Sequence, residues 1–284
     1  MQGEERMTTR ETLRQQGEAM RARLHGDRRP PAEIAAGQST PGFQQMMTEA
    51  VFGGIWARPG LALADRMICT LAALALLQRL PHLRQYVAAA VDAGLPPRAI
   101  LEVFVQCGLY GGFPTTETAS AIAHEVFADR GIVIPDEPPR TDTLETLDAR
   151  GRALLRELHG ERGSQGYAAP GNAVTGALYP TAIQYGYGEL WFRPGLDRRQ
   201  RMLCAVASFT VLGLESQVTK FGQSALSAGL SRQEVVEAVI QTAPYGGFPR
   251  ALNALAALSD VLSEVADPTG PPLRETNKSS GPPG

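Results

Sequence analysis

Two side chains that could move protons lie one helical turn apart in this sequence. His82 and Tyr86 follow Pro81 in a segment that we expect to be helical, so both side chains share one face and can reach a common ligand. Histidine exchanges protons near neutral pH, and a tyrosine hydroxyl can donate a hydrogen bond to a developing oxyanion. The spacing therefore predicts acid–base chemistry here. The alternative is that His82 is an exposed residue at a helix start.

A polar row lies on the next predicted helix. Glu102, Gln106 and Tyr110 are spaced at i, i+4 and i+8 and share one face, while the residues between them are mostly apolar. One interpretation is a buried hydrogen-bond network that satisfies the backbone at the break near Gly111-Gly112. The other is that the row lines a site, where Gln106 and Tyr110 would orient the His82–Tyr86 pair.

Arg66 lies near the start of an earlier helix and is a candidate anion-binding residue. Its guanidinium could hold a substrate carboxylate through two parallel hydrogen bonds. It could equally form a structural ion pair with Glu102 or with Glu237.

The chain contains this unit twice. A shift of 135 positions aligns 52–127 with 187–262 without a gap, and about 25 of the 76 positions are identical. The polar row recurs, but Gln217 and Phe221 replace His82 and Tyr86, and this pair cannot exchange a proton. We therefore expect one working site at most, with copy two serving mainly architecture and lending Trp191 or Tyr245 to a shared apolar pocket.

Both copies are predicted to be helical, and the fold to be all-α. The expected domains are residues 8–131 and 142–266, joined by a linker with Gly131 and three prolines and followed by a disordered tail, 267–284. The predicted helices are 11–24, 64–78, 81–93, one after Leu95 and one ending at Phe127, with counterparts at 145–158, 198–213, 215–228, after Leu230 and up to Leu262. His25 and His159 each precede a glycine at a helix end, where we expect them to act as cationic caps.

Composition limits the function classes. The net charge of −2 without a basic stripe argues against nucleic-acid binding, and the longest apolar run, Leu71–Leu77, is too short for a membrane span. The N-terminus lacks the features of a signal peptide. Cys69, Cys107 and Cys204 form no close pair, so we expect reduced, buried thiols in a cytoplasmic protein without a metal site.

The motifs resemble those of the carboxymuconolactone decarboxylase family, within the alkylhydroperoxidase-D-like all-α superfamily. The matching segments are 42–47, 52–61 with its Trp56-Ala-Arg-Pro-Gly-Leu run, the Arg66 helix, Ala93-Gly94, and Glu102 through Gln106 to Tyr110 and Pro114; copy two matches from Tyr187 onward. This resemblance implies two tandem alkylhydroperoxidase-D-like helical domains. Because single-domain members form trimers and hexamers, it also implies a dimer or trimer of these tandem chains.

The resemblance also bears on the chemistry. The family's decarboxylases use no metal or organic cofactor and carry a Glu-x-x-x-His pair where His82 and Tyr86 stand here. The peroxidase branch carries Cys-x-x-Cys-x-x-x-His at positions that are Arg79, His82 and Tyr86 in this chain, so thiol peroxidase chemistry is not expected.

We expect a cofactor-independent lyase or isomerase that acts on a small lactone, carbonyl or polyketide-like substrate. His82 would act as acid or base, Tyr86 would donate to an enolate or carboxylate, and Arg66 would bind an anionic group. Further contacts would come from Trp56, Gln106, Tyr110, Trp191 and Tyr245. One alternative is a non-catalytic binding or scaffold protein in which both sites have decayed. Another is a pocket that steers cyclisation by its shape, without an essential acid or base.

Overall fold

The protein is all-α, as predicted. The computed structural model describes residues 8–37, 40–165, 169 and 171–264, and within these ranges it contains helices and no strand. The predicted tail, 267–284, lies outside the described residues. Copy one comprises α1 (Arg10–His25), α2 (Ala32–Gly37), α3 (Phe43–Met46), the π-helix η1 (Met47–Trp56), α4 (Leu63–Leu76), α5 (Leu80–Asp92), α6 (Pro97–Gly111) and α7 (Phe113–Ala128).

Copy two repeats this order. Its elements are α8 (Leu144–His159), the 3₁₀ helix η2 (Gly160–Ser164), α9 (Tyr179–Thr181), the π-helix η4 (Ala182–Glu189), the 3₁₀ helix η5 (Leu190–Phe192), α10 (Arg198–Leu212), α11 (Glu215–Ser227), α12 (Arg232–Gly246) and α13 (Phe248–Glu264). Residues 132–143, which connect the copies, form neither helix nor strand.

Local sequence signals account for the helix boundaries. Asp197 and Ser231 each begin a helix with a capping box, in which the side-chain oxygens of Gln200 and Glu234 accept a hydrogen bond from the backbone N–H of the cap residue. Gly94 follows α5 with a positive φ of 84°, a conformation that suits glycine. These caps place the predicted helices within a few residues of their observed ends.

The π-helices were not predicted, and they bring the N-terminal helices against the core. Helix α1 crosses η1 at Gly17 and Gly53, where a Cβ on either glycine would collide with a carbonyl oxygen of the other segment. Gly151 and Gly188 make the same crossing between α8 and η4. Because the backbones approach so closely, the last turn of α1 is held at the wall of the cavity described below.

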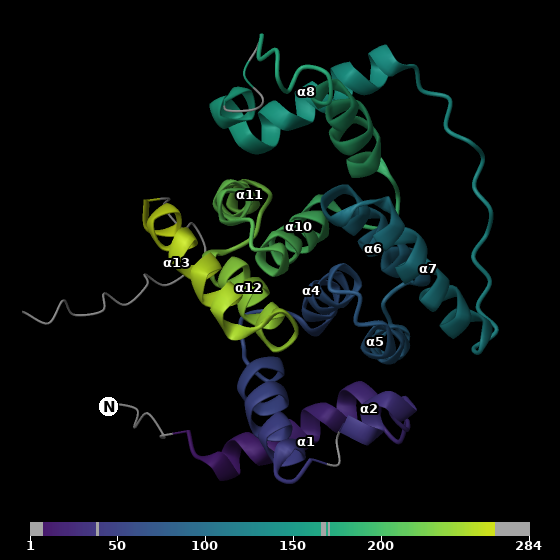
Figure 1. The fold of residues 1–284 in the computed structure, drawn as a ribbon, viewed down its shortest axis with the longest axis vertical. Coiled ribbons are helices and arrows are strands. Elements are labelled where there is room, and N and C mark those ends of the chain that lie inside the picture. Colours follow the sequence, from purple (N-terminus) through teal and green to yellow (C-terminus); the bar gives the residue numbers. More distant parts are fainter. Residues whose placement is uncertain (1–7, 38–39, 166–168, 170, 265–284) are drawn as a thin grey trace, which may run out of the picture.

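The two copies interlock through their central helices. Helices α4 and α10 pack against each other, α12 of copy two packs on α4, and α6 of copy one packs on α10. Figure 1 shows these four helices between α1 and α2 at one end of the molecule and α8 at the other. Each copy therefore completes the surroundings of the other copy's first core helix.

In the part of the chain that the structure describes, none of the helices combines the length and the apolarity that crossing a bilayer requires.

Candidate functional site

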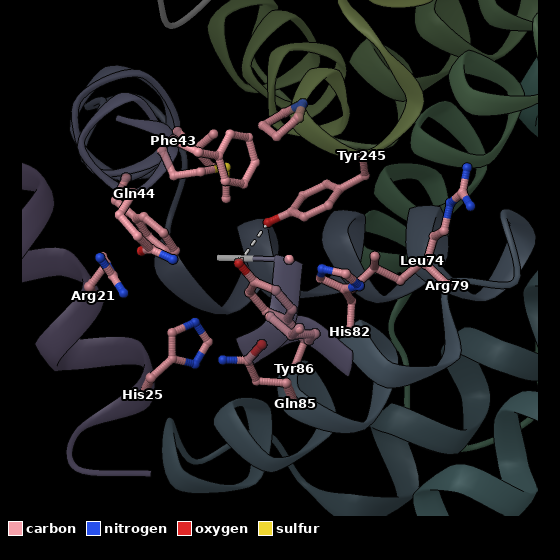
Figure 2. A pocket seen from close by; sticks show the side chains of 16 residues that line it. Arg21, His25, Phe43, Gln44, Leu74, Arg79, His82, Gln85, Tyr86 and Tyr245 are labelled. Carbon is pink, nitrogen blue, oxygen red and sulfur yellow. Dashed lines mark hydrogen bonds between the residues drawn. The ribbon is translucent and has the colours of Figure 1, made fainter. Parts of the chain in front are cut away.

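A cavity opens on copy one between the end of α1 and the first turns of α5. Its volume is about 440 Å³, in the range of pockets that hold small organic ligands. Residues of α2, α3, η1, α4 and the end of α12 complete its wall. Its polar lining residues are Arg21, His25, Gln44, Arg79, His82, Gln85, Tyr86 and Tyr245, and Figure 2 shows all but Arg79 gathered around one space.

Three aromatic side chains form a directed chain of hydrogen bonds at this wall. The Trp56 indole N–H donates to Tyr245 Oη over 2.9 Å, and the Tyr245 hydroxyl donates to Tyr86 Oη over 3.0 Å, the bond drawn in Figure 2. An indole can only donate, so the direction of donation runs from Trp56 toward Tyr86. The hydroxyl proton of Tyr86 is therefore left for a ligand in the cavity.

Burial keeps these phenols protonated. Burial and the neighbouring Tyr245 raise the pKa of Tyr86 well above its usual value, and burial raises the pKa of Tyr245 to about 12. The Trp56 ring stacks on Tyr86 with a centroid distance of 5.6 Å and an interplanar angle of 11°, which holds the phenol in place. At neutral pH, Tyr86 is a hydrogen-bond donor and not a base.

His82 lines the same cavity, one helical turn before Tyr86. His82 is partly exposed, and its partial burial together with the neighbouring Arg79 lowers its pKa from the usual value. The structure thus brings the two residues of the predicted pair to one cavity. Their chemical roles remain predictions.

His25 differs from the cationic cap that the sequence analysis expected. It ends α1 as predicted, but its side chain is only 9% exposed and its ring lies edge-on to Tyr86 at 5.2 Å. Burial, then Arg28 and Arg21, lowers the pKa of His25 to about 4. The imidazole is therefore neutral, and the capping prediction is wrong for this residue.

Arg21 is a second cavity residue that sequence reasoning missed. It lies one turn before His25, donates to Thr48 Oγ1 over 2.9 Å, and has its guanidinium over the Phe52 ring at 5.4 Å. With Arg79, it places positive charge at the wall of the cavity. An anionic group of a ligand could form an ion pair with the Arg21 guanidinium at this wall.

Arg66 is held in an ion pair between the copies. It is 1% exposed, and its guanidinium donates to Glu237 over 2.9 Å, to Gln241 over 3.0 Å and to backbone carbonyls of 58 and 59. The structural alternative accounts for all these contacts, and Arg66 is not among the residues that line the cavity. Arg201 makes the equivalent pair with Glu102 over 3.2 Å.

Copy two has its own cavity, of about 460 Å³, and its chemistry is different. Trp191, Tyr110 and Phe221 line it, so a phenyl ring stands where copy one has the Tyr86 phenol. Trp191 Nε1 has no hydrogen-bond partner within the described residues. Of the predicted substrate contacts, Tyr245 thus belongs to the first cavity, and Tyr110 and Trp191 belong to the second.

His159, the counterpart of His25, is also no cationic cap. It is 1% exposed, and its ring nitrogens pair with Ser224 Oγ at 2.7 Å and with Tyr187 Oη at 3.0 Å. Burial, then Lys220 and Arg162, lowers its pKa to about 3. It is a neutral, fully hydrogen-bonded histidine.

Besides Phe221 in place of Tyr86, a second substitution separates the hydrogen-bond networks of the two copies. The amide of Gln241 donates to Thr70 Oγ1 over 3.1 Å, which leaves Tyr245 Oη free to accept from the Trp56 indole. In copy two the residue at the Thr70 position is Ala205. There the amide of Gln106 donates to Tyr110 Oη over 2.7 Å instead. Gln106 therefore belongs to the network beside the second cavity and does not orient His82.

The three thiols are buried in the core, as predicted. Cys69, Cys107 and Cys204 are each 0% exposed and free, and burial raises the pKa of Cys69 and Cys107 above the usual value. None of them lines the first cavity. Over residues 8–37, 40–165, 169 and 171–264, no three His, Cys, Asp or Glu side chains converge as metal ligands would.

Known proteins resemble this chain in both copies. Residues 41–125 and 177–260 each match the carboxymuconolactone decarboxylase family. A 90-residue segment is 36% identical to the 4-carboxymuconolactone decarboxylase of Acinetobacter baylyi, covering 32% of this chain and 67% of that protein. Another 90-residue alignment is 29% identical to the nitrosuccinic acid decarboxylase of Metarhizium robertsii, covering 30% of this chain and 59% of that protein.

A solved structure shares the fold over nearly the whole chain. It is described as a candidate gamma-carboxymuconolactone decarboxylase subunit from Burkholderia xenovorans LB400. It superposes with a TM-score of 0.52 at 18% identity, covering 89% of this chain and 98% of that one. At this identity the likeness establishes the fold alone.

Proposed function

Because this chain belongs to the carboxymuconolactone decarboxylase family, we propose that its first cavity carries out a lyase or isomerase reaction without a cofactor. The substrate is a small acid that contains a lactone, a carbonyl or a comparable electron-accepting group. The observation that supports this most directly is the hydrogen-bond chain that ends in the Tyr86 hydroxyl, aimed at a cavity with cationic side chains. Copy two, with Phe221 in this place, supports the first cavity and has no equivalent site.

The reaction needs an electron acceptor and a group that stabilises it. When a carboxylate leaves as CO₂, the electron pair of the broken C–C bond passes through the adjacent unsaturated group to an oxygen. An isomerisation places charge on such an oxygen after a C–H bond is broken. A neutral phenol that donates to this oxygen stabilises the charge, and deleting one such donor lowers kcat by about 100- to 1000-fold in other enzymes.

Charge and shape favour an organic anion as the substrate. Arg21 and Arg79 border the cavity, so a carboxylate that remains on the substrate can bind near the Arg21 guanidinium, with Arg79 adding positive charge to the wall. Arg66, which the sequence analysis assigned to this task, already has Glu237 as its partner. The apolar wall formed by residues such as Val51 and Phe52 limits water around the reacting group.

The experiment compares Tyr86→Phe with Tyr187→Phe, which deletes one hydroxyl at the second cavity. Each variant and the parent protein are incubated with 4-carboxymuconolactone and with nitrosuccinate, and CO₂ release is followed. We expect turnover of at least one substrate, a loss of about 100-fold in Tyr86→Phe, and little change in Tyr187→Phe.

Two outcomes would count against the proposal. Equal turnover by Tyr86→Phe and the parent would show that the Tyr86 hydroxyl takes no part in the reaction. Tight binding of both acids without turnover by any protein would favour the non-catalytic binding protein.

A further inference from the structure

The imidazole of His25 lies in the wall of the first cavity, and its buried Nδ1 has no hydrogen-bond partner. Its side chain is more than nine-tenths buried, its Nδ1 has no partner, and the ring contacts Tyr86 edge-on. Figure 2 shows it facing the same space as Tyr86 and Gln85. Buried polar atoms normally form at least one hydrogen bond, so the unpaired Nδ1 of His25 requires an explanation.

A comparison with copy two shows which hydrogen-bond partners His25 lacks. His159 occupies the equivalent position and is held by Ser224 and Tyr187. At the corresponding positions copy one has Ala89 and Phe52, neither of which can form a side-chain hydrogen bond. Beside the second cavity both ring nitrogens of the histidine thus have partners, whereas beside the first cavity the buried Nδ1 of His25 has none.

His25, whose Nδ1 has no partner, is also the histidine that contacts the Tyr86 phenol. The charged and titratable groups around it are Arg21 of α1, Arg28 in the segment that follows α1, and Tyr86 of α5, and none of these is a carboxylate. Without a carboxylate to stabilise the imidazolium, the ring stays neutral at physiological pH. A neutral imidazole can accept a proton, while Tyr86 donates to oxygen.

We propose that His25 is the catalytic base of the first cavity and that it removes a proton from carbon in an organic acid whose carbonyl, lactone or nitro oxygen is bound by Tyr86. This step rests on the proposed function of the same cavity. The C–H bond breaks, the proton passes to the imidazole, and the electron pair moves onto the oxygen that accepts from Tyr86. Return of the proton to a different carbon completes an isomerisation, so no co-reactant is consumed.

The test uses a probe that does not depend on the natural substrate. With 5-nitrobenzisoxazole, a base removes the proton at C3, the N–O bond breaks as a nitrile forms, and the electron pair ends on a phenolate oxygen. The product is coloured and needs no carboxylate site. We expect the parent protein to catalyse this elimination and His25→Asn to lower kcat/KM by about 100-fold.

Matched variants separate a base from a structural residue. His124→Asn, which replaces an exposed histidine on α7, is the control that should retain the parental rate. In His25→Ala, added imidazole should restore part of the rate, which a merely structural role would not allow. The parental rate should stay level down to about pH 5 and fall only toward the His25 pKa of about 4.

Two results would overturn the proposal. The first is a loss in His82→Asn that equals or exceeds the loss in His25→Asn, since this would assign the base to His82. The second is an unchanged rate in a folded His25→Asn. If the decarboxylation assays fail while the elimination still depends on His25, the proposed decarboxylation is contradicted but His25 is still a base. The failure of the proposed function and the failure of this proposal can therefore be told apart.

Discussion

Removing the charge of Glu237 should destabilise the junction between the two copies. Its carboxylate is 3% exposed and accepts from Arg58 over 2.7 Å and from Arg66 over 2.9 Å. Glu237→Gln keeps the size of the side chain and deletes the charge that both guanidinium groups share.

The magnitude follows from the burial of the two arginines. Arg58 is 42% exposed and can be solvated when its partner is lost, whereas Arg66 is 1% exposed and cannot. Breaking a buried pair costs about 3–5 kcal/mol. Since Arg66 keeps its bonds to Gln241 and to two carbonyls, we expect the lower end, about 3 kcal/mol.

The assay is equilibrium unfolding in urea, followed by circular dichroism. Glu137→Gln is the control, because Glu137 pairs with Arg98 at the surface and is 42% exposed. Its loss should be below about 1 kcal/mol. A loss of less than about 1 kcal/mol in Glu237→Gln, or equal losses in both variants, would refute the assignment of this cluster as a buried ion pair.

Three further predictions concern the hydroxyl chain, the buried histidines and the assembly. Thr70→Ala should let the Gln241 amide turn to Tyr245 and release the Trp56 indole, lowering kcat by about tenfold, or ~1.4 kcal/mol; an unchanged kcat would contradict the directed chain. His25 and His159 have pKa values of about 4 and about 3, below the value of about 6.5 in the unfolded chain, so the folded state binds fewer protons. The free energy of unfolding should therefore fall as pH drops from about 6.5 toward 4, by up to about 1.4 kcal/mol per pH unit for each histidine; chemical denaturation across this range measures it, and a flat profile would contradict the burial. Light scattering should give the mass of a dimer or trimer, since Phe113 and Phe248 are 64% and 56% exposed in a single chain; a monomer mass would disprove this.

Sequence patterns were sufficient for the helices because their signals are local. The capping boxes at Asp197 and Ser231 and the glycine after α5 act within a few residues. The π-helices were missed because they depend on backbone contact with α1 and α8, which are distant in sequence. Local sequence signals therefore predict where the helices lie, but they do not predict tertiary contacts between elements that are distant in the sequence.

The candidate site was found in part for the same reason. His82 and Tyr86 share one helix, so their spacing placed them together. The Trp56–Tyr245 bond joins residues 189 positions apart, and no periodicity reports such a contact. His25 was read as a cap because its helix-end position is visible in the sequence, whereas the burial of its ring depends on the fold.

The central claim is that one working cavity exists and that copy two completes it through Tyr245. The direct measurement is kcat/KM for decarboxylation in Tyr245→Phe and in Tyr110→Phe, which remove equivalent hydroxyls beside the two cavities. We predict a loss of at least tenfold, or ~1.4 kcal/mol, for Tyr245→Phe and no more than a twofold change, or ~0.4 kcal/mol, for Tyr110→Phe. Equal effects of the two substitutions, or a larger loss in Tyr110→Phe, would contradict the account.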